Sequence, residues 1–285
     1  MRVCRFGEGR LGLVEGASVR DVTAALDELP SYRYPLPRFD VLIARLDSVM
    51  ARVRAIAAAS PSLPLASVSL LSPVANPSKI IAAPLNYQKH LDEVRGDAQI
   101  HHNKPVAAIH TAGLFLKAVS SLAGPGEGVA LRKLDRRNDH EVELVVVIGR
   151  QGSNVPRADA LGHVAGYCVG LDISIRGPED RSLRKSPDSY ALLGPWLVTR
   201  DEIADPGELD LSISVNGEER QRSNTKYMIL DVPALIEWAS SFYTLYPGDI
   251  IMTGTPEGVS PIQPGDVIRA FVEKIGTMEV KVGAA

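Results

Sequence analysis

The sequence predicts an α+β fold with mixed, mostly antiparallel sheets. Short β-rich segments separated by Pro-Gly turns favour antiparallel strands, and the chain lacks the alternating β-α-β rhythm of a doubly wound sheet. Its one G-x-G-x-x-G match, at residues 7–12, leads from one predicted strand into another rather than into a helix, and the chain has no Walker loop. A parallel nucleotide-binding fold is therefore disfavoured.

The length of 285 residues suits one large domain or two unequal domains. Residues 60–77 are rich in Pro and Ser and have no helical periodicity, which indicates a boundary near residue 73. We therefore expect a small N-terminal α/β domain over residues 1–73 and a larger domain over residues 74–285.

Local patterns predict the order of the elements along the chain. In the small domain they indicate strands at 1–6 and 11–14 and amphipathic helices at 19–29 and 41–59. In the large domain they indicate a strand at 79–83, a short helix capped by Asn86, a buried central strand at 144–149, a helix at 232–242, and strands at 249–252 and 266–272.

Composition argues against nucleic-acid binding and membrane insertion. The net charge of -3 offers no basic surface, and no apolar run approaches the length of a membrane span. Cys4 and Cys168 form neither a disulfide framework nor a CxxC metal motif, and the N-terminus lacks an apolar signal core. We expect a soluble protein in the reducing cytoplasm.

Glu141 and Glu143 are the most informative residues of the chain. Side chains two residues apart on a strand share a face, and this strand continues into the β-branched run 144–149. Unpaired carboxylates are costly in such a place, so a cation should face them. Asp172 adds a third oxygen ligand, and the lack of Cys or His spacing favours Mg²⁺ or Mn²⁺ over Zn²⁺. For Glu-x-Glu alone, a solvated strand face is the plainer alternative.

Two further groups of polar residues suggest chemistry. Asp172, Ser174 and Arg176 alternate with apolar residues on one strand face, either as a local salt bridge or as an anion-binding group. His90 and Glu93 lie three residues apart on the predicted short helix, where the carboxylate can orient the imidazole for activation of water. An exposed pair of this kind is usually only a surface ion pair.

Three other segments are less distinctive. Lys185 is by default a solvated loop lysine. Residues 253–259 directly follow a strand, and their small side chains let backbone and hydroxyl donors approach a carboxylate. Residues 94–113 look irregular and form either a lid that orders over a ligand or a mobile surface loop.

Taken together, these residues resemble the fumarylacetoacetate hydrolase family over roughly residues 74–285. The matching pieces are Asn86-Tyr87-x-x-His90-x-x-Glu93, Phe115-Leu116-Lys117, Glu141-x-Glu143-Leu144, Asp172-Ile173-Ser174-Ile175-Arg176, Gly194-Pro195-Trp196, Asn216-Gly217-Glu218-x-x-Gln221 and Thr253-Gly254-Thr255-Pro256-x-Gly258-Val259. The resemblance implies a mixed β-sandwich roll and a homodimer.

The resemblance also implies roles for single residues. Glu141, Glu143 and Asp172 would bind the divalent ion, Mg²⁺ or Mn²⁺. His90 and Glu93 would form the water-activating dyad. Lys185 would steady developing negative charge, and the substrate-binding residues would be Tyr87, Lys117, Arg176, Gln221 and Thr255.

One segment departs from the commoner pattern of the family. Many relatives carry Arg-Asp-x-Gln, whereas this chain has Arg176-Gly177-Pro178-Glu179 and reaches Lys185 sooner. Glu179 stands where a neutral amide often faces the distal end of the substrate. This difference leaves the identity of the substrate open but not the metal chemistry.

The predicted function is metal-dependent hydrolysis of a carbon–carbon bond in an acylpyruvate, a small 2,4-dioxo acid. The family resemblance alone implies substrates such as maleylpyruvate or fumarylpyruvate. An oxaloacetate-type decarboxylase or a keto-enol isomerase would need the same chelated enolate without a hydrolytic water. Residue types do not separate these reactions. A silent metal-binding scaffold is disfavoured because it would not need His90, Glu93 and Lys185 beside the acidic trio.

Overall fold

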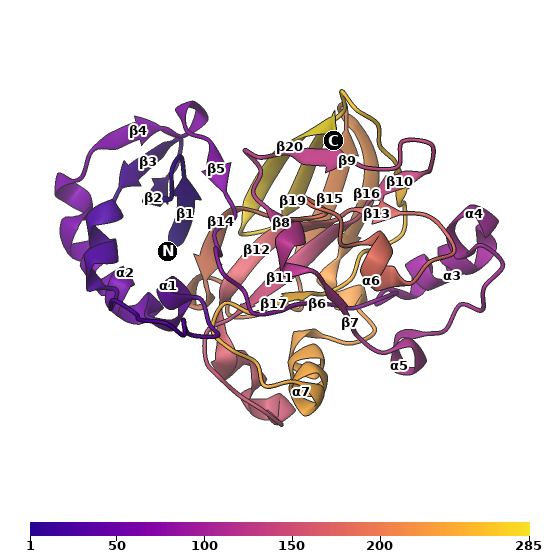
Figure 1. The fold of residues 1–285 in the computed structure, drawn as a ribbon, viewed down its shortest axis with the longest axis horizontal. Coiled ribbons are helices and arrows are strands. Elements are labelled where there is room, and N and C mark those ends of the chain that lie inside the picture. The colour runs from indigo at the N-terminus through magenta and orange to yellow at the C-terminus, as the bar shows by residue number, and fades with distance from the viewer.

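A twelve-stranded sheet runs through the computed structural model, which describes residues 1–285 (Figure 1). In spatial order its main path is β4 (Ser62–Pro64), β3 (Ser18–Asp21), β2 (Arg10–Glu15), β1 (Arg2–Phe6), β14 (Ala191–Thr199), β12 (Val164–Asp172), β11 (Val142–Ile148), β17 (Ile250–Met252), β6 (Ile80–Ala82) and β7 (Phe115–Lys117). Two short strands lie off this path, β5 (Leu70–Leu71) beside β1 and β8 (Leu122–Ala123) beside β14.

Two smaller sheets complete the fold. One contains β13 (Ser174–Ile175), β10 (Asn138–His140) and β18 (Ser260–Pro261), and the other contains β16 (Glu218–Asn224), β15 (Asp210–Val215), β19 (Val267–Val272), β20 (Gly276–Ala284) and β9 (Val129–Leu131). Only β8–β14, β6–β17 and β9–β20 are parallel pairs. The predicted α+β fold with mixed, mostly antiparallel sheets is confirmed.

The helices lie around the sheets (Figure 1). The N-terminal lobe carries α1 (Val41–Ala44) and α2 (Leu46–Ile56), and the rest of the chain carries α3 (Gln88–Gly96), α4 (Ala98–His101), α5 (Ile109–Ala112), α6 (Arg181–Arg184) and α7 (Val232–Phe242). The predicted helix at 232–242 matches α7. No helix has the length and apolar character needed to cross a membrane.

The two central strands of the large sheet lie in the core. Every residue of β11 and β12 is buried, because these two strands occupy the middle of the large sheet. A separate cluster of eight buried apolar residues lies in the N-terminal lobe, yet β1 of that lobe pairs with β14. The domain boundary near residue 73 stays a prediction.

Two local predictions are wrong. The predicted helix at 19–29 is strand β3 followed by a 3-10 helix at Thr23–Glu28, because β3 gains backbone partners from β2 and β4 on both sides. Asn86 does not cap α3, whose N-cap is Tyr87. The buried Asn86 amide instead donates to the carbonyl oxygens of Leu230 and Thr253 and so joins two loops.

Candidate active site

The pairing of β11 with β12 brings the three predicted metal ligands together. Val142 is opposite Leu171, so Glu141 and Asp172 meet at the end of the pair, where the Asp172 N–H donates to the Glu141 carbonyl at 3.0 Å. One carboxylate oxygen from each of Glu141, Glu143 and Asp172 lies within 4.8 Å of the others, and all three residues are buried. The predicted clustering of these carboxylates is confirmed.

Lysine and arginine side chains balance part of this charge. Lys185 is buried and donates to Glu141 and Asp172, at 2.6 Å in each case. Arg176 donates to Glu141 at 2.8 Å, and Lys117 is paired with Asp172. The default interpretation of Lys185 as a solvated loop lysine is therefore wrong.

Glu141 and Glu143 differ in their electrostatic surroundings. Burial alone would raise the pKa of Glu141, but Lys185 and Arg176 bring it well below its usual range. Burial, followed by the charges of Asp172 and Glu141, raises the pKa of Glu143 well above its usual value. Glu143 has no ion pair, and its hydrogen-bond donor is the Gly254 N–H at 2.7 Å.

These residues fit a hard divalent cation. Three buried carboxylates supply only oxygen donors, which suits Mg²⁺ or Mn²⁺. Glu143 is the carboxylate that the protein leaves without a cation, so a bound ion would relieve its raised pKa.

The predicted His–Glu pair is formed on α3. The His90 Nδ1 is 2.8 Å from a Glu93 carboxylate oxygen, and the other Glu93 oxygen accepts from the Gly258 N–H at 2.9 Å. Gly258 has a φ of +94°, and a Cβ there would lie 2.2 Å from the Arg220 carbonyl oxygen, so glycine is required. His90 itself is buried, and Nε2 has no hydrogen-bonding role toward Glu93, which contacts Nδ1.

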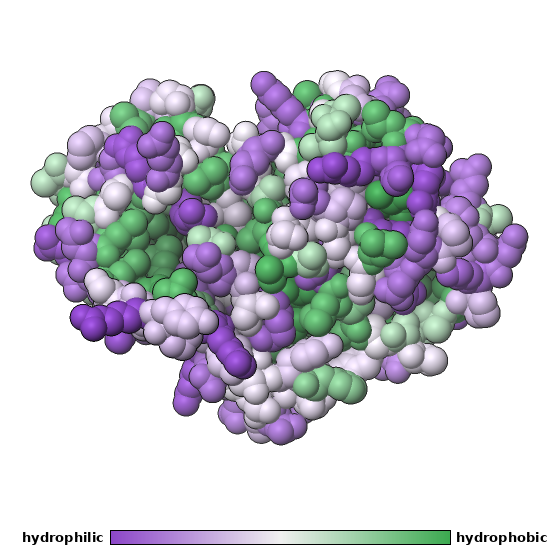
Figure 2. All heavy atoms as spheres, viewed as in Figure 1, coloured by the Kyte–Doolittle hydropathy of each residue, from purple (hydrophilic) through white to green (hydrophobic).

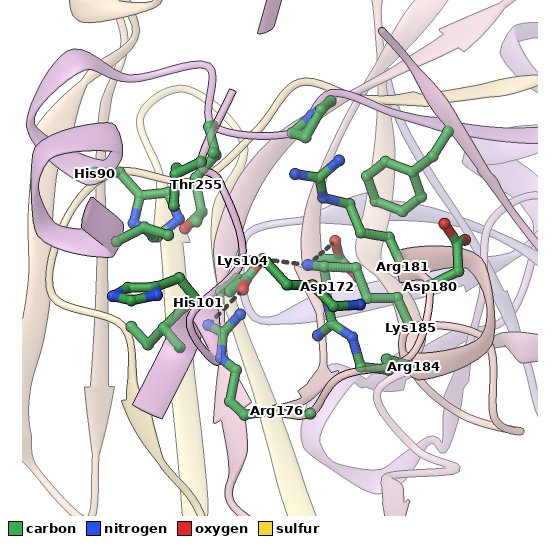
Figure 3. A pocket seen from close by; sticks show the side chains of 18 of the residues that line it. His90, His101, Lys104, Asp172, Arg176, Asp180, Arg181, Arg184, Lys185 and Thr255 are labelled. Atoms are coloured by element: carbon green, nitrogen blue, oxygen red, sulfur yellow. Dashed lines mark hydrogen bonds and ion pairs between the residues drawn. The ribbon is translucent and has the colours of Figure 1, made fainter. Parts of the chain in front are cut away.

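A cavity of about 270 Å³ lies beside these groups. Its wall contains seven of the eleven predicted site residues, namely His90, Glu141, Glu143, Asp172, Arg176, Lys185 and Thr255. In Figure 3, His90 and Thr255 lie on one side of the view, and Arg181, Arg184 and Lys185 on the other. The predicted lid segment 94–113 contributes to the same wall, while its mobility stays a prediction.

Four predicted residues lie outside the cavity wall. Glu93 contacts His90, and Lys117 contacts Asp172. The Gln221 amide accepts from Val142 N–H at 3.1 Å and donates to Thr255 at 2.9 Å, so its observed contacts are with the protein.

The fourth residue, Tyr87, is buried, and its hydroxyl has no hydrogen-bonding partner. Burial and the charge of Glu143 raise its pKa. Thr255 lines the cavity, but its hydroxyl donates to the Val142 carbonyl at 2.9 Å. The roles of Tyr87, Lys117, Gln221 and Thr255 toward a substrate stay predictions.

Sequence reasoning missed several basic residues of the wall. Arg181 and Arg184 come from α6, and His101 and Lys104 from the segment after α3. The spacing of three residues between the arginines on a short helix was an available signal. Glu179 also lines the cavity, but Arg136 binds both of its carboxylate oxygens, at 2.9 and 2.8 Å.

Comparison with known proteins identifies the family. The family model described as fumarylacetoacetate (FAA) hydrolase C-terminal matches residues 79–283. The chain belongs to the fumarylacetoacetate hydrolase family. The maleylpyruvate hydrolase of Aquipseudomonas alcaligenes is 60% identical over 286 residues, which cover 99% of each chain. A mitochondrial oxaloacetate tautomerase of Homo sapiens is 39% identical over 233 residues, which cover 77% of this chain and 71% of that protein.

A solved structure of the same family matches along the whole chain. The maleylpyruvate hydrolase from Sphingobium sp. SYK-6, in complex with manganese(II) ion and pyruvate, has a TM-score of 0.85 and 39% identity, and the match covers 100% of both chains. The family resemblance and the fold that it implied are thereby confirmed.

Proposed function

We propose that the chain is a divalent-metal-dependent hydrolase that cleaves maleylpyruvate into maleate and pyruvate. The observation that carries this proposal is the position of His90, oriented by Glu93, in the wall of the cavity that the three carboxylates line. The 60% identity with a maleylpyruvate hydrolase supports the substrate, and the related complex with manganese and pyruvate supports the metal.

Glu141, Glu143 and Asp172 would hold the ion, which supplies Lewis acidity toward the 2-oxo acid and its developing enolate charge. His90 accepts a proton from water at Nε2, because its Nδ1 is bonded to Glu93. The resulting hydroxide attacks the acyl carbonyl, and the bond from that carbon to the pyruvyl methylene carbon breaks.

The remaining steps need a positive charge and a proton donor. Lys185 lines the cavity beside the Phe115 ring, and its charge would stabilise the negative charge that develops on the attacked carbonyl. The proton that His90 accepted is then available to the departing methylene carbon, so the products are a carboxylate and pyruvate.

A substrate panel tests this function. Maleylpyruvate, fumarylpyruvate, acetylpyruvate and oxaloacetate would be assayed for pyruvate release with Mg²⁺ or Mn²⁺. We expect cleavage of maleylpyruvate, loss of turnover in excess EDTA, and recovery with Mn²⁺. Full activity in EDTA would refute the role of the ion.

The panel also separates the rival reactions. Pyruvate release from oxaloacetate without cleavage of any acylpyruvate would replace the hydrolase with a decarboxylase. Conversion between the keto and enol forms of oxaloacetate, with no pyruvate formed, would instead assign a tautomerase.

We further propose that the protein is a cytoplasmic homodimer. Three large apolar side chains are exposed: Leu116 on β7, Val119 just after that strand, and Leu183 on α6. Figure 2 shows hydrophobic residues exposed in the central part of this face. Both cysteines are buried and free, which suits a reducing compartment. Light scattering should give twice the mass of one chain, and Leu183→Glu should shift the protein toward monomer. A monomeric wild type would contradict the dimer.

A further inference from the structure

Arg181 is a cation of the cavity wall that has no partner in the protein. The wall contains four other lysine and arginine residues, and each of them donates a hydrogen bond to a protein oxygen. The half-buried Arg181 side chain forms no hydrogen bond and no ion pair. It extends from α6 into the cavity (Figure 3).

Arg184 adds a second charge without a carboxylate partner. It lies one helical turn after Arg181, and it donates to the carbonyl oxygens of Glu179 at 3.0 Å and Ile175 at 2.8 Å. Burial lowers the pKa of both guanidinium groups, although an arginine stays charged near neutral pH. A partly buried positive charge of this kind is stabilised when an anion binds to it.

The charge of the cavity matches an anion with two carboxylates. Five lysine and arginine residues and five carboxylates line it, so a divalent cation would leave two net positive charges when the histidines are neutral. Maleylpyruvate carries one carboxylate on the pyruvyl group and one at the far end of the acyl chain. The ion held by the three carboxylates would bind the pyruvyl carboxylate, so the distal carboxylate needs a separate cation in the cavity wall.

We propose that Arg181 binds the distal carboxylate of the substrate, with Arg184 beside it, and thereby selects acylpyruvates that end in a carboxylate. The planar guanidinium group of Arg181 can donate two parallel hydrogen bonds to a carboxylate. This inference rests on the proposed function and adds the residue that determines its substrate class.

The test compares the effect of each variant on maleylpyruvate with its effect on butanoylpyruvate, which has a saturated acyl chain and no distal carboxylate. In butanoylpyruvate a methyl group replaces the distal carboxylate of a four-carbon acyl chain. Arg181→Met should lower kcat/KM for maleylpyruvate by about 10- to 100-fold and leave kcat/KM for butanoylpyruvate nearly unchanged. Arg181→Lys should retain part of the maleylpyruvate activity. Arg269→Met, which removes an exposed arginine of β19, should change neither value.

Equal losses on both substrates, or no loss on either, would overturn the inference. A binding experiment keeps it separate from the proposed function. In calorimetry with Mn²⁺-loaded protein, the wild type should bind maleate more tightly than butyrate, and Arg181→Met should remove that difference. If the wild type cleaves no acylpyruvate, the proposed function fails, while the calorimetric difference still decides the role of Arg181.

Discussion

The two sides of the cavity differ in how their charges are balanced. On the carboxylate side, Lys185 bridges Glu141 and Asp172 with short hydrogen bonds, so the protein holds these groups in place before any ligand arrives. On α6, Arg181 and Arg184 have no carboxylate partner. The bridged carboxylates suit chemistry that is common to all 2-oxo acids. The unpaired arginines suit the binding of a second negative charge, which only some substrates carry.

This difference predicts two kinds of variant. A substitution among the three carboxylates should impair turnover of every substrate because it removes metal binding, and loss of water activation should impair every hydrolysis. A substitution on α6 should impair only substrates with a distal carboxylate.

The largest effect is expected from Glu143→Ala. This variant should lose Mn²⁺ binding in calorimetry and all metal-dependent turnover, yet remain folded, since the change also removes repulsion from Asp172 and Glu141. Glu179→Ala is the matched control, a cavity carboxylate outside the trio that should keep its Mn²⁺ affinity. Unchanged Mn²⁺ affinity in Glu143→Ala would remove Glu143 from the ligand set.

A smaller effect, confined to one reaction, is expected from His90→Ala. Loss of a positioned base typically lowers the rate by roughly 10²- to 10⁴-fold, so acylpyruvate hydrolysis should fall by about that much. Mn²⁺ affinity should survive, and any oxaloacetate decarboxylation should fall much less, because it needs no activated water. His101→Ala, in the same cavity wall, serves as the control. Equal losses in both reactions would rule out His90 as the water-activating base.

The carboxylate side was predictable from the sequence because strand geometry is local. Glu141 and Glu143 lie two residues apart beside a β-branched run, so a shared face and burial follow from strand periodicity alone. The His90–Glu93 contact likewise follows from helical spacing. The α+β class could be predicted for the same reason, from short apolar segments and their turns.

The basic side was predictable only in part. The spacing of Arg181 and Arg184 was a local signal, but their place in the cavity wall depends on contacts between distant segments. The path from Arg176 to Lys185 is held by the pair of Arg136 with Glu179, which are 43 residues apart. By pattern alone Lys185 is a loop residue, and only the family resemblance placed it at the site. Tertiary pairing also outweighed the helical pattern in β3.

The last prediction concerns the pH dependence of stability, to which a histidine beside the carboxylates contributes and the arginines of α6 do not. His140, next to Glu141, is buried between Gln221 at 3.3 Å and Ser260 at 2.8 Å, and burial lowers its pKa to about 4. A histidine with a lowered pKa in the folded state stabilises the protein fully above its unfolded pKa of about 6.5, and this contribution falls as the pH drops toward 4. The arginines of α6 do not titrate in this window.

Between pH 7 and pH 5, His140 should therefore cost the metal-free protein about 2 kcal/mol of unfolding free energy. The raised pKa of Glu143 acts in the opposite direction, since its contribution is present at low pH and is lost as the pH rises. The informative quantity is thus the difference between wild type and His140→Gln, measured by urea unfolding at both pH values. We expect that difference to shrink by about 2 kcal/mol at pH 5, whereas a constant difference would mean that folding leaves the pKa of His140 unchanged.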